Sequence, residues 1–398
     1  MKKFILINSL YGGGAEKVAF NLFRTLDFDK IFLLEKDIKY EVPKEKVVFL
    51  LKHNYKTNAI LKTLFIPIHS LRLKKYLNPD DVIISFLERS NYVNILTSLI
   101  TKHKTIVSIR MSQIFGRFKL HPYNLLSKFL YPKANLIVAV SEGIKDELIK
   151  TFSISSEKIK VIYNPIFFNE IQEKIKEPLD EYEIIFQKEV LINVGRLTKQ
   201  KGQWYLLRIF KEVKKEFPNL KLVILGEGEL KNYLVELSQR LNLKTFVWDR
   251  NDLTKDYDVY FLGFQNNPYK FIAHSKAFIF PSLFEGFPNA LVETMAYGVP
   301  VVSSDCRTGP REILAPDTDF NFQTKEPEFA QYGILMPIFQ NRFLNHKDDL
   351  TIEEKMWIET LKKVLNNNYL VEKYKNLSIE RAKDFDIKNI ILKWKEII

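Results

Sequence analysis

Two glutamates lie eight residues apart in the segment PSLFEGFPNALVETMAYGVP, which spans residues 281–300. The apolar run at its start predicts a short buried strand, and Pro288 suits the first position of the helix that the following pattern predicts. Glu285 then lies in the loop between strand and helix, and Glu293 lies about a turn and a half inside the helix. Carboxylates in these places can bind sugar hydroxyls, although near a helix start they are also ordinary partners of the helix dipole.

The start of the same helix offers a place for phosphate oxygens. The first N–H groups of a helix have no partner inside it, and the helix dipole adds partial positive charge there. The backbone of residues 286–290 can therefore hold an anion. The residues predicted to contact it are Phe287, Pro288, Asn289 and Ala290.

A second loop combines two cations with two glycines. In VLINVGRLTKQKG an apolar strand leads into a loop that contains Gly195, Arg196, Lys201 and Gly202. Glycine lets an anion approach the backbone, arginine can bind it with two parallel hydrogen bonds, and lysine adds a point charge. A solvated basic loop is the ordinary alternative for Lys201 taken alone.

A glycine-rich turn follows the first predicted strand. The chain runs from FILIN into SLYGGGAEKVAFNL, where Gly12, Gly13 and Gly14 open a helix and let phosphates approach the backbone. The spacing is neither that of a P-loop nor that of G-x-G-x-x-G, which argues against a kinase or a dehydrogenase. A sharp turn that needs positive φ explains the same glycines and does not exclude the phosphate interpretation.

Length and composition predict a globular protein of two domains. The chain has 398 residues, of which 46% are hydrophobic and 27% are charged. It has no run long enough for a membrane span, and its N-terminus lacks the long apolar core of a signal peptide. The single cysteine, Cys306, excludes an internal disulfide, and the six histidines lack metal-ligand spacing. We therefore expect a cytoplasmic protein without a metal site.

The excess of positive charge is confined to the first part of the chain. Residues 1–168 hold 27 Lys/Arg and 14 Asp/Glu, whereas residues 169–398 hold 33 and 34. Residues 46–79 and residues 89–141 contain no acidic residue at all. Such stretches suit nucleic acid, anionic lipid or a phosphorylated acceptor equally well.

Apolar runs of strand length alternate with helical patterns along the whole chain. The runs are FILIN, KIFLL, VVFLL, DVIISFL, TIVSI and LIVAVS, followed by VLINVG, LKLVILG, VYFLGF, AFIFPS and VPVVSS. This alternation predicts parallel sheets with helices on both faces, built twice. The charged segment 169–188 is the expected connection between the two, and ligands are expected at the carboxyl ends of the strands.

These motifs together resemble a known family. EGFPNALVE resembles the E-x7-E signature of the family 4 retaining glycosyltransferases, and the loop around Gly195 and the GGAE turn resemble two further motifs of the family. The chain is similar to the GT-B enzymes of this family over almost its full length. The resemblance implies an α/β protein with two Rossmann-like, doubly wound domains facing a central cleft. The acceptor-side domain would comprise residues 1–168 with a returning helix at 380–398, and residues 185–379 would bind the donor.

The resemblance also implies roles for the candidate residues. Glu293 would bind the ribose hydroxyls of a nucleotide-sugar donor, and Glu285 would contact the transferred sugar. Arg196 and Lys201 would neutralise the donor diphosphate. Further donor contacts are implied on the glycine turns, at Gly13, Gly14, Gly195 and Gly263, the last of these beside the nucleotide base. In such enzymes a departing phosphate oxygen accepts the acceptor proton, so no protein base is needed. Because Arg196 and Lys201 already supply positive charge, we expect no cofactor and no metal.

One position departs from the family pattern. Family members commonly carry a histidine after a strand of the first domain, and the corresponding stretch TIVSIRMSQ holds Arg110. A cation that stays protonated cannot act as a base, but it can stabilise leaving-group charge or bind an acceptor phosphate. His121 is expected to be a surface residue. The motif DYD at 256–258 suggests a metal, but it precedes a strand instead of ending one, so we reject that interpretation.

Two basic segments also carry many apolar groups. Segment 56–77 contains Ile60, Leu61, Leu64, Phe65, Ile68, Leu71, Leu73 and Leu77 with Lys56, Lys62, Arg72, Lys74 and Lys75, and Pro67 begins its second helical piece. Segment 110–133 contains Phe115, Phe118, Tyr123, Phe129 and Tyr131 with Arg117, Lys119, Lys128 and Lys133. This mixture favours an anionic membrane surface as partner, unless at least half of the apolar residues face the core. Nucleic acid is the rival partner, but no nucleic-acid-binding motif supports it.

We therefore expect a retaining glycosyltransferase that lies on the inner face of the plasma membrane. It would move a sugar from a nucleotide-diphosphate sugar, with UDP favoured, to a lipid-linked or lipopolysaccharide-type glycan. SFLERSNYVN and DCRTGPREILAP also resemble bacterial surface-polysaccharide enzymes, and Arg311 and Glu312 in the second lie near the donor or begin a helix. The alternatives are a GT-B sugar-nucleotide epimerase and a basic nucleic-acid or lipid-binding protein without catalysis.

Overall fold

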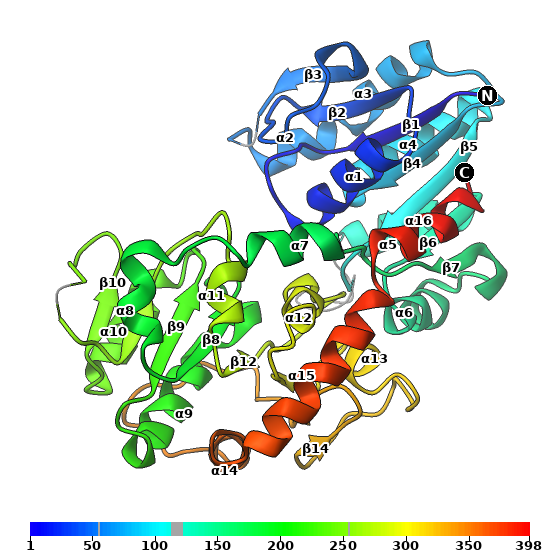
Figure 1. Ribbon diagram of the computed structural model, residues 1–398. Coiled ribbons are helices and arrows are strands. Elements are labelled where there is room, and N and C mark those ends of the chain that lie inside the picture. The colour runs from blue at the N-terminus through cyan, green and yellow to red at the C-terminus, as the bar shows by residue number, and fades with distance from the viewer. Residues whose placement is uncertain (55, 113–121, 254) are drawn as a thin grey trace. The chain divides into compact units, whose positions relative to one another are not determined.

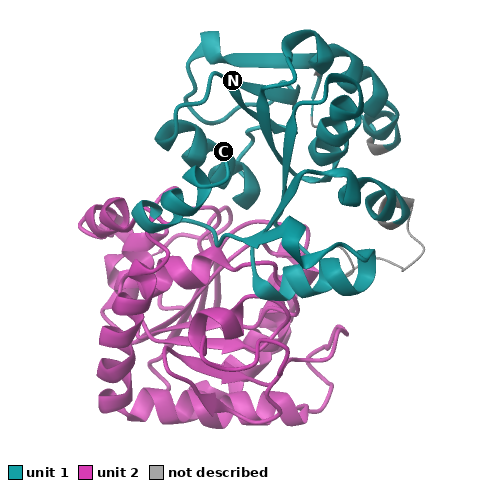
Figure 2. Cartoon of the chain, turned by 90° about the vertical axis from the view of Figure 1, so that its right-hand side faces the viewer, with its two compact units in different colours: residues 1–165, 387–398 teal, residues 166–386 magenta. Residues whose placement is uncertain are grey.

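The computed structural model describes residues 1–54, 56–112, 122–253 and 255–398 (Figure 1). The chain divides into two compact units, unit 1 with Met1–Pro165 and Ile387–Ile398, and unit 2 with Ile166–Asp386 (Figure 2). The sequence prediction began the returning segment at residue 380, whereas in the structure it begins at Ile387. Within the described ranges, no helix is both long enough and apolar enough to cross a membrane.

Unit 1 is built on a seven-stranded parallel sheet with the strand order β3-β2-β1-β4-β5-β6-β7. Its strands are β1 (Lys3–Ile7), β2 (Lys30–Glu35), β3 (Val47–His53), β4 (Val82–Phe86), β5 (Lys104–Ile109), β6 (Leu136–Ala139) and β7 (Ile159–Val161). The strands coincide with apolar runs in the sequence. Helices cover both faces of a parallel sheet, so side chains on both sides of its strands are buried. The chain order reverses between β1 and β4, where Ile7 pairs with Phe86.

Helices connect these strands. They are α1 (Gly14–Thr25), α2 (Ala59–Leu64), α3 (Ile66–Leu73), α4 (Glu88–Thr101), α5 (Pro122–Leu130), α6 (Glu142–Phe152) and α16 (Ile387–Lys395). Short 3-10 helices are η1 (Lys44–Lys46), η2 (Lys74–Tyr76), η3 (Tyr131–Lys133) and η4 (Ser156–Lys158). Pro67 lies in the first turn of α3, which confirms the helix start predicted there, because the missing N–H of proline has no partner to lose at that place.

The C-terminal helix α16 completes the core of unit 1. Trp394 is fully buried, and its ring centroid lies 6.2 Å from that of Phe86. Lys104 Nζ donates a hydrogen bond to the carbonyl oxygen of Ile397 at 2.9 Å. The end of the chain is therefore part of the fold that the beginning of the chain forms.

Unit 2 is built on an eight-stranded sheet with the order β10-β11-β9-β8-β12-β13-β15-β14. Its strands are β8 (Val190–Val194), β9 (Lys221–Leu225), β10 (Thr245–Val247), β11 (Val259–Phe261), β12 (Ala277–Phe280), β13 (Val301–Ser304), β14 (Glu328–Phe329) and β15 (Ile334–Met336). All neighbours are parallel except β14 and β15. Both units therefore confirm the predicted doubly wound α/β architecture.

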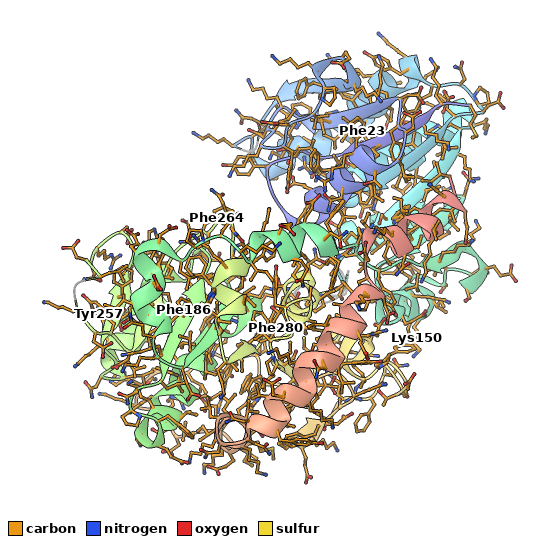
Figure 3. The ribbon with its side chains drawn as sticks, viewed as in Figure 1. Phe23, Lys150, Phe186, Tyr257, Phe264 and Phe280 are labelled. Atoms are coloured by element: carbon orange, nitrogen blue, oxygen red, sulfur yellow. The ribbon has the colours of Figure 1, made fainter. Side chains whose placement is uncertain are left out.

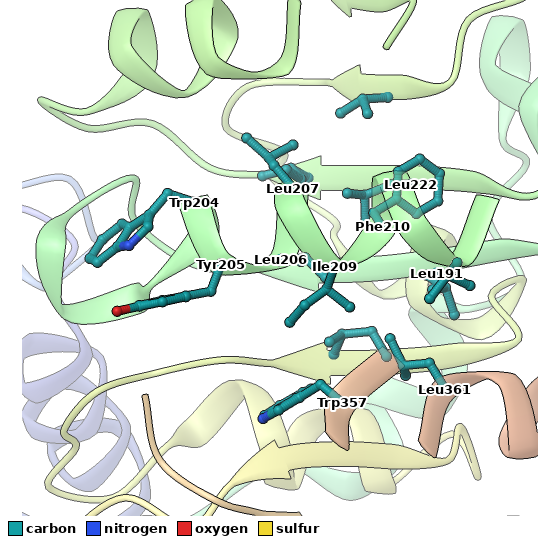
Figure 4. Close-up of a cluster of buried hydrophobic side chains, with 14 of the residues drawn as sticks. Leu191, Trp204, Tyr205, Leu206, Leu207, Ile209, Phe210, Leu222, Trp357 and Leu361 are labelled. Atoms are coloured by element: carbon teal, nitrogen blue, oxygen red, sulfur yellow. The ribbon is translucent and has the colours of Figure 1, made fainter. Parts of the chain in front are cut away.

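Helices connect the strands of unit 2, and some of them contribute to one large apolar core. They are α7 (Phe168–Lys174), α8 (Glu183–Phe186), α9 (Gln203–Glu216), α10 (Lys231–Arg240), α11 (Tyr269–Ala273), α12 (Asn289–Met295), α13 (Pro310–Leu314), α14 (Ile352–Asn366) and α15 (Asn368–Lys383), with the 3-10 helices η5 (Asp180–Tyr182) and η6 (Lys199–Lys201). Trp204 and Phe210 of α9 and Trp357 of α14 are buried in this core, and Phe210 lies beside Leu222 of β9 (Figure 4).

The charged segment 169–188, predicted as a connection between domains, folds onto unit 2. Its apolar residues Ile171 and Ile185 are buried. Gln172 Nε2 donates a hydrogen bond to the carbonyl oxygen of Ala296 at 2.5 Å. Composition concealed this packing because the few apolar residues of the segment are spaced among many charges.

Replacing Trp394 by alanine is expected to lower the free energy of unfolding by about 3–5 kcal/mol, because it removes a fully buried ring and leaves a cavity. Chemical unfolding followed by circular dichroism measures this loss. Leu392→Ala, on the exposed side of the same helix, is the matched control and should change stability by less than about 0.5 kcal/mol. Equal losses in both variants would contradict the packing of α16 described above.

Candidate active site

The predicted site residues of unit 2 lie at the carboxyl ends of two adjacent strands. β8 and β12 are neighbours, and the strand order reverses between them. β8 leads into the loop with Arg196 and Lys201, and β12 leads into the loop with Glu285. A reversal of this kind is where doubly wound sheets bind their ligands.

Backbone contacts hold these two loops together. Leu283 N donates a hydrogen bond to Gln200 O at 2.8 Å. Gly202 has a φ of +63°, and a Cβ atom at this residue would lie 2.4 Å from Pro281 O. Glycine is therefore required here both for its backbone conformation and for the close approach of the second loop.

Glu285 is buried and held by two side chains from the other loop. Lys201 Nζ lies 2.5 Å from Glu285 Oε1, and the two side chains are 15% and 7% exposed. Gln200 Nε2 donates to Glu285 Oε2 at 3.2 Å and to Phe284 O at 2.8 Å. Sequence reasoning missed Gln200, for which the position beside Lys201 was the only signal.

Arg196 differs from Lys201 in having its charge available. It is exposed, and its guanidinium makes no hydrogen bond or ion pair with any residue that the structure describes. Lys201, in contrast, is already paired with Glu285. Of the two cations predicted to meet an anion, Arg196 is therefore the one that can do so without giving up a partner. The phosphate roles of both residues stay predictions.

The helix that follows Glu285 begins one residue later than predicted. Pro288 is the N-cap of α12, with φ −79° and ψ 93°, instead of its first helical residue. Phe287 is buried, and its ring centroid lies 5.5 Å from that of Phe385. Its side chain therefore belongs to the packing of unit 2. The anion contacts predicted along this stretch, including those at Asn289 and Ala290, stay predictions.

Glu293 lies half-buried on α12, one turn before Tyr297. Burial, with smaller contributions from Tyr269 and Glu293, raises the pKa of Tyr297, so its phenol stays neutral. The Tyr297 hydroxyl has no hydrogen-bond partner among the described residues. This hydroxyl is buried, so the hydroxyl-binding role predicted on this helix rests on the Glu293 carboxylate alone and stays a prediction.

Three glycine turns lie side by side at the ends of β8, β9 and β11. A Cβ atom on Gly226 would lie 2.0 Å from Gly195 O, and Gly226 N donates to Gly263 O at 2.8 Å. Gly263 has a φ of +69°, and a Cβ atom there would meet the Trp248 ring at 2.7 Å. The next residue, Phe264, is 70% exposed, whereas Phe280 at the end of β12 is buried (Figure 3). The structure therefore brings Gly195 and Gly263 together, as their common assignment to the donor requires.

The glycine turn of unit 1 is occupied by a side chain of the protein itself. Glu16 Oε2 accepts hydrogen bonds from Gly12 N at 2.9 Å and from Gly13 N at 2.5 Å. Glu16 Oε1 accepts a hydrogen bond from Ser9 Oγ at 2.5 Å. The predicted phosphate contact at Gly13 would thus require Glu16 to move, and the contact at Gly14 stays a prediction.

Arg110 lies in a buried setting after β5. Its Nη1 donates to Asn164 Oδ1 at 2.5 Å, and its guanidinium carbon lies 5.3 Å from the ring centroid of Phe86 and 5.6 Å from that of Trp394. Burial lowers its pKa to about 9. Its Nε and Nη2 atoms have no hydrogen-bond partner among the described residues. Even with this lowered pKa the guanidinium is cationic at neutral pH, and the role of Arg110 toward a ligand stays a prediction.

Arg311 and Glu312 belong to the internal support of unit 2. Arg311 Nη2 lies 2.6 Å from Asp305 Oδ2 and 2.7 Å from Glu328 Oε2. Burial raises the pKa of Asp305, and Arg311 opposes this rise. The carbonyl oxygen of Glu312 accepts a hydrogen bond from Arg381 Nη2 at 2.8 Å. Of the two interpretations weighed for this stretch, the start of a helix, α13, is the one that the structure supports.

The two aspartates of the DYD motif pair with lysines. Asp256 Oδ1 lies 2.5 Å from Lys221 Nζ, and Asp258 Oδ1 lies 2.9 Å from Lys214 Nζ. Both carboxylates therefore form ion pairs with lysines just before β11 begins. His121 lies outside the described residues, as do Phe115, Arg117, Phe118 and Lys119.

Replacing Glu16 by alanine is expected to lower the free energy of unfolding by about 2–3 kcal/mol, because three hydrogen bonds to a carboxylate are lost. Urea unfolding measures the effect. Glu157→Ala, an exposed glutamate of the same unit, should change stability by less than about 0.5 kcal/mol. A Glu16→Ala protein as stable as the parent would show that this carboxylate does not hold the glycine turn.

A solved structure shares this fold over its full length. The crystal structure of Anabaena HepE in complex with UDP aligns with a TM-score of 0.73, covering 100% of this chain and 99% of HepE at 18% sequence identity. At that identity the likeness concerns the fold alone. The two parallel sheets described above thus form a GT-B fold.

Sequence comparison identifies the family. The profile described as Glycosyltransferase Family 4 matches residues 12–168, and the profile described as Glycosyl transferases group 1 matches residues 174–331. An uncharacterized glycosyltransferase of Methanocaldococcus jannaschii is 36% identical over 93% of each chain. The N-acetylgalactosamine-N,N'-diacetylbacillosaminyl-diphospho-undecaprenol 4-alpha-N-acetylgalactosaminyltransferase of Campylobacter jejuni is 33% identical over 96% of this chain and 95% of its own. The chain belongs to the family 4 glycosyltransferases.

Proposed function

We propose that this glycosyltransferase moves a sugar from a nucleotide-diphosphate sugar, with UDP favoured, to a lipid-linked or lipopolysaccharide-type glycan, with retention of configuration. The observation that carries the proposal is the buried Glu285 carboxylate, held by Lys201, on loops next to the available guanidinium of Arg196. This arrangement offers an acceptor for sugar hydroxyls beside a cation for a diphosphate. UDP in HepE and the diphospho-undecaprenol in the name of the Campylobacter relative support the UDP and lipid parts.

The proposed chemistry places proton transfer on the donor. The bond between the anomeric carbon and the diphosphate oxygen breaks while the acceptor oxygen bonds to the same carbon on the same face. The acceptor proton passes to the departing phosphate oxygen. Arg196, with Lys201, stabilises the negative charge that develops there. No protein base, cofactor or metal takes part in this scheme.

The two glutamates hold the donor in the proposed scheme. Glu285 binds hydroxyls of the transferred sugar, and its burial favours one fixed orientation of the carboxylate. Glu293, half-buried on α12, binds the ribose. The two residues should therefore differ in effect, Glu293 acting on donor affinity and Glu285 more on turnover.

Arg110 is proposed to act on the phosphate of the donor or of the acceptor. Aromatic rings on two sides keep its guanidinium away from water, and a phosphate would complete the hydrogen bonds of its Nε and Nη2 atoms. A desolvated guanidinium stabilises such an anion more strongly than an exposed one.

A basic apolar surface on unit 1 is proposed to contact the membrane. We define it as α2 and α3 with their flanking lysines, together with α5. Five apolar side chains of α2 and α3 are exposed, namely Ile60, Leu61, Leu64, Ile68 and Leu71. In α5 Leu125 and Phe129 are also exposed. Leu73 and Tyr131, in contrast, are buried, and Phe115 and Phe118 lie outside the described residues, so the expectation that at least half of the apolar residues of the two segments face the core stays a prediction.

The composition of this surface fits an anionic bilayer. Ile60 and Leu64 lie four residues apart in α2, and Ile68 and Leu71 lie three residues apart in α3, so each pair lies along one side of its helix. Exposed lysines lie nearby at Lys74 and Lys75, and no acidic residue occurs between 46 and 79. Each such cation contributes about 1 kcal/mol near anionic lipid. We infer that the protein is cytoplasmic and binds the inner face of the plasma membrane.

Glu285→Gln and Arg196→Ala are each expected to lower kcat/KM for sugar transfer by about 100-fold, because transition-state contacts are lost. Transfer of labelled sugar from UDP-sugars to a diphospho-undecaprenol-linked glycan measures the rate, and circular dichroism checks folding. The exposed residues Glu359 and Arg240, changed to Gln and Ala, are the matched controls. Because the proposed chemistry uses no metal, EDTA should leave the rate of sugar transfer by the parent protein unchanged. Parent-like turnover in both site variants, or epimerisation of the donor without transfer, would contradict the proposal.

Serine at Ile60, Leu64 and Ile68 together is expected to lower binding to phosphatidylglycerol vesicles at least about tenfold, since three exposed apolar side chains no longer enter the bilayer. Vesicle flotation measures this binding. Ile352→Ser, an equally exposed apolar residue of unit 2, is the control and should float like the parent. Tight binding of duplex DNA without flotation of the parent protein would favour a nucleic-acid partner instead.

A further inference from the structure

We propose that Gln200 is a positioning residue for sugar transfer, which keeps the Glu285 carboxylate in place when Lys201 turns toward the donor diphosphate. This inference rests on the proposed function and deepens it. It starts from the observation that one buried carboxylate receives two side-chain donors from the same short stretch. The two donors differ in charge, and that difference gives them different roles.

Each donor serves its own oxygen of Glu285. Lys201 Nζ contacts Oε1 at 2.5 Å, and Gln200 Nε2 contacts Oε2 at 3.2 Å. With both oxygens occupied, rotation of the carboxylate would break at least one contact. The orientation of Glu285 is thus defined by two points, and either one alone defines it less well.

A diphosphate competes for only one of these donors. Lys201 is a flexible ammonium, and a nearby diphosphate carries more negative charge than the carboxylate that it now faces. The attraction that holds Lys201 on Glu285 is therefore weakened when a donor binds next to Arg196. The Gln200 amide is neutral, so the diphosphate exerts no comparable pull on it.

Gln200 is also better anchored than Lys201. The side-chain nitrogen of Gln200 also donates a hydrogen bond to Phe284 O at 2.8 Å. The backbone carbonyl oxygen of Gln200 accepts a hydrogen bond from Leu283 N, also at 2.8 Å. An amide nitrogen has two N–H groups, which suffice for Phe284 O and Glu285 Oε2 together. A leucine in place of Gln200 would have no side-chain N–H group to donate. A glutamate in the same place would put a second negative charge beside Glu285.

The test compares Gln200→Leu with the parent in the transfer assay. At saturating donor and acceptor, kcat should fall about tenfold, the factor expected for one lost hydrogen bond to a charged group. The dissociation constant for UDP, measured by calorimetry, should change less than about twofold. Lys201→Met should show the opposite balance, with the larger effect on UDP binding. Gln239→Leu, an exposed glutamine on α10, is the control and should keep the parent kcat.

A double-mutant cycle separates positioning from a general loss of structure. If Gln200 acts through Glu285, Gln200→Leu should have no further effect on kcat in the Glu285→Gln background. A parent-like kcat in Gln200→Leu, an undiminished effect in Glu285→Gln, or a loss confined to UDP affinity would each overturn the inference. These outcomes leave the proposed function standing. Absence of transfer by the parent protein would instead remove the proposed function itself, and the inference with it.

Discussion

The arrangement of the candidate active site depends on the ion pair between Lys201 and Glu285. A carboxylate that is 5% exposed requires partners, and the loop after β8 provides both of them. Separating the two loops would leave a buried charge without compensation, which costs more than the pair itself contributes. The close contact at Gly202 allows this geometry, because a side chain there would collide with Pro281. Arg196, on the same loop, takes no part in this ion pair, so its charge is available to an anion.

Parallel sheets explain why these loops meet. Strands that are buried on both faces must send the chain across the sheet through a helix, so their carboxyl ends lie at one edge. Doubly wound sheets bind their ligands at the point where the strand order reverses. The order reverses between β1 and β4 in unit 1 and between β8 and β12 in unit 2. The two reversals have different contents: Glu16 fills the glycine turn of unit 1, whereas unit 2 carries the cation and the carboxylates.

Charge is divided between the units in a way that fits two separate tasks. The basic excess lies in residues 1–168, where α2 and α3 expose apolar side chains among lysines. The donor-side residues lie in the part of the chain without such an excess. Their positive charge is local, since Arg196 stands beside paired groups instead of within a basic surface. The proposed attraction to a membrane and the proposed binding of a diphosphate therefore rest on different parts of the chain.

The sequence by itself determined the alternating strands and helices and the doubly wound class, and it predicted Arg196, Lys201 and Glu285 as site residues, because these depend on local periodicity and short motifs. Only the tertiary structure decided which groups pair. Gln200 meets Glu285 across 85 residues of chain, and the ring of Phe287 packs against that of Phe385. Glu16, three residues after Gly13, accepts the hydrogen bond of the Gly13 N–H group that was predicted to meet a phosphate. Spacing shows which side chains are near, but the choice among competing partners depends on burial, which exists only after the chain has folded.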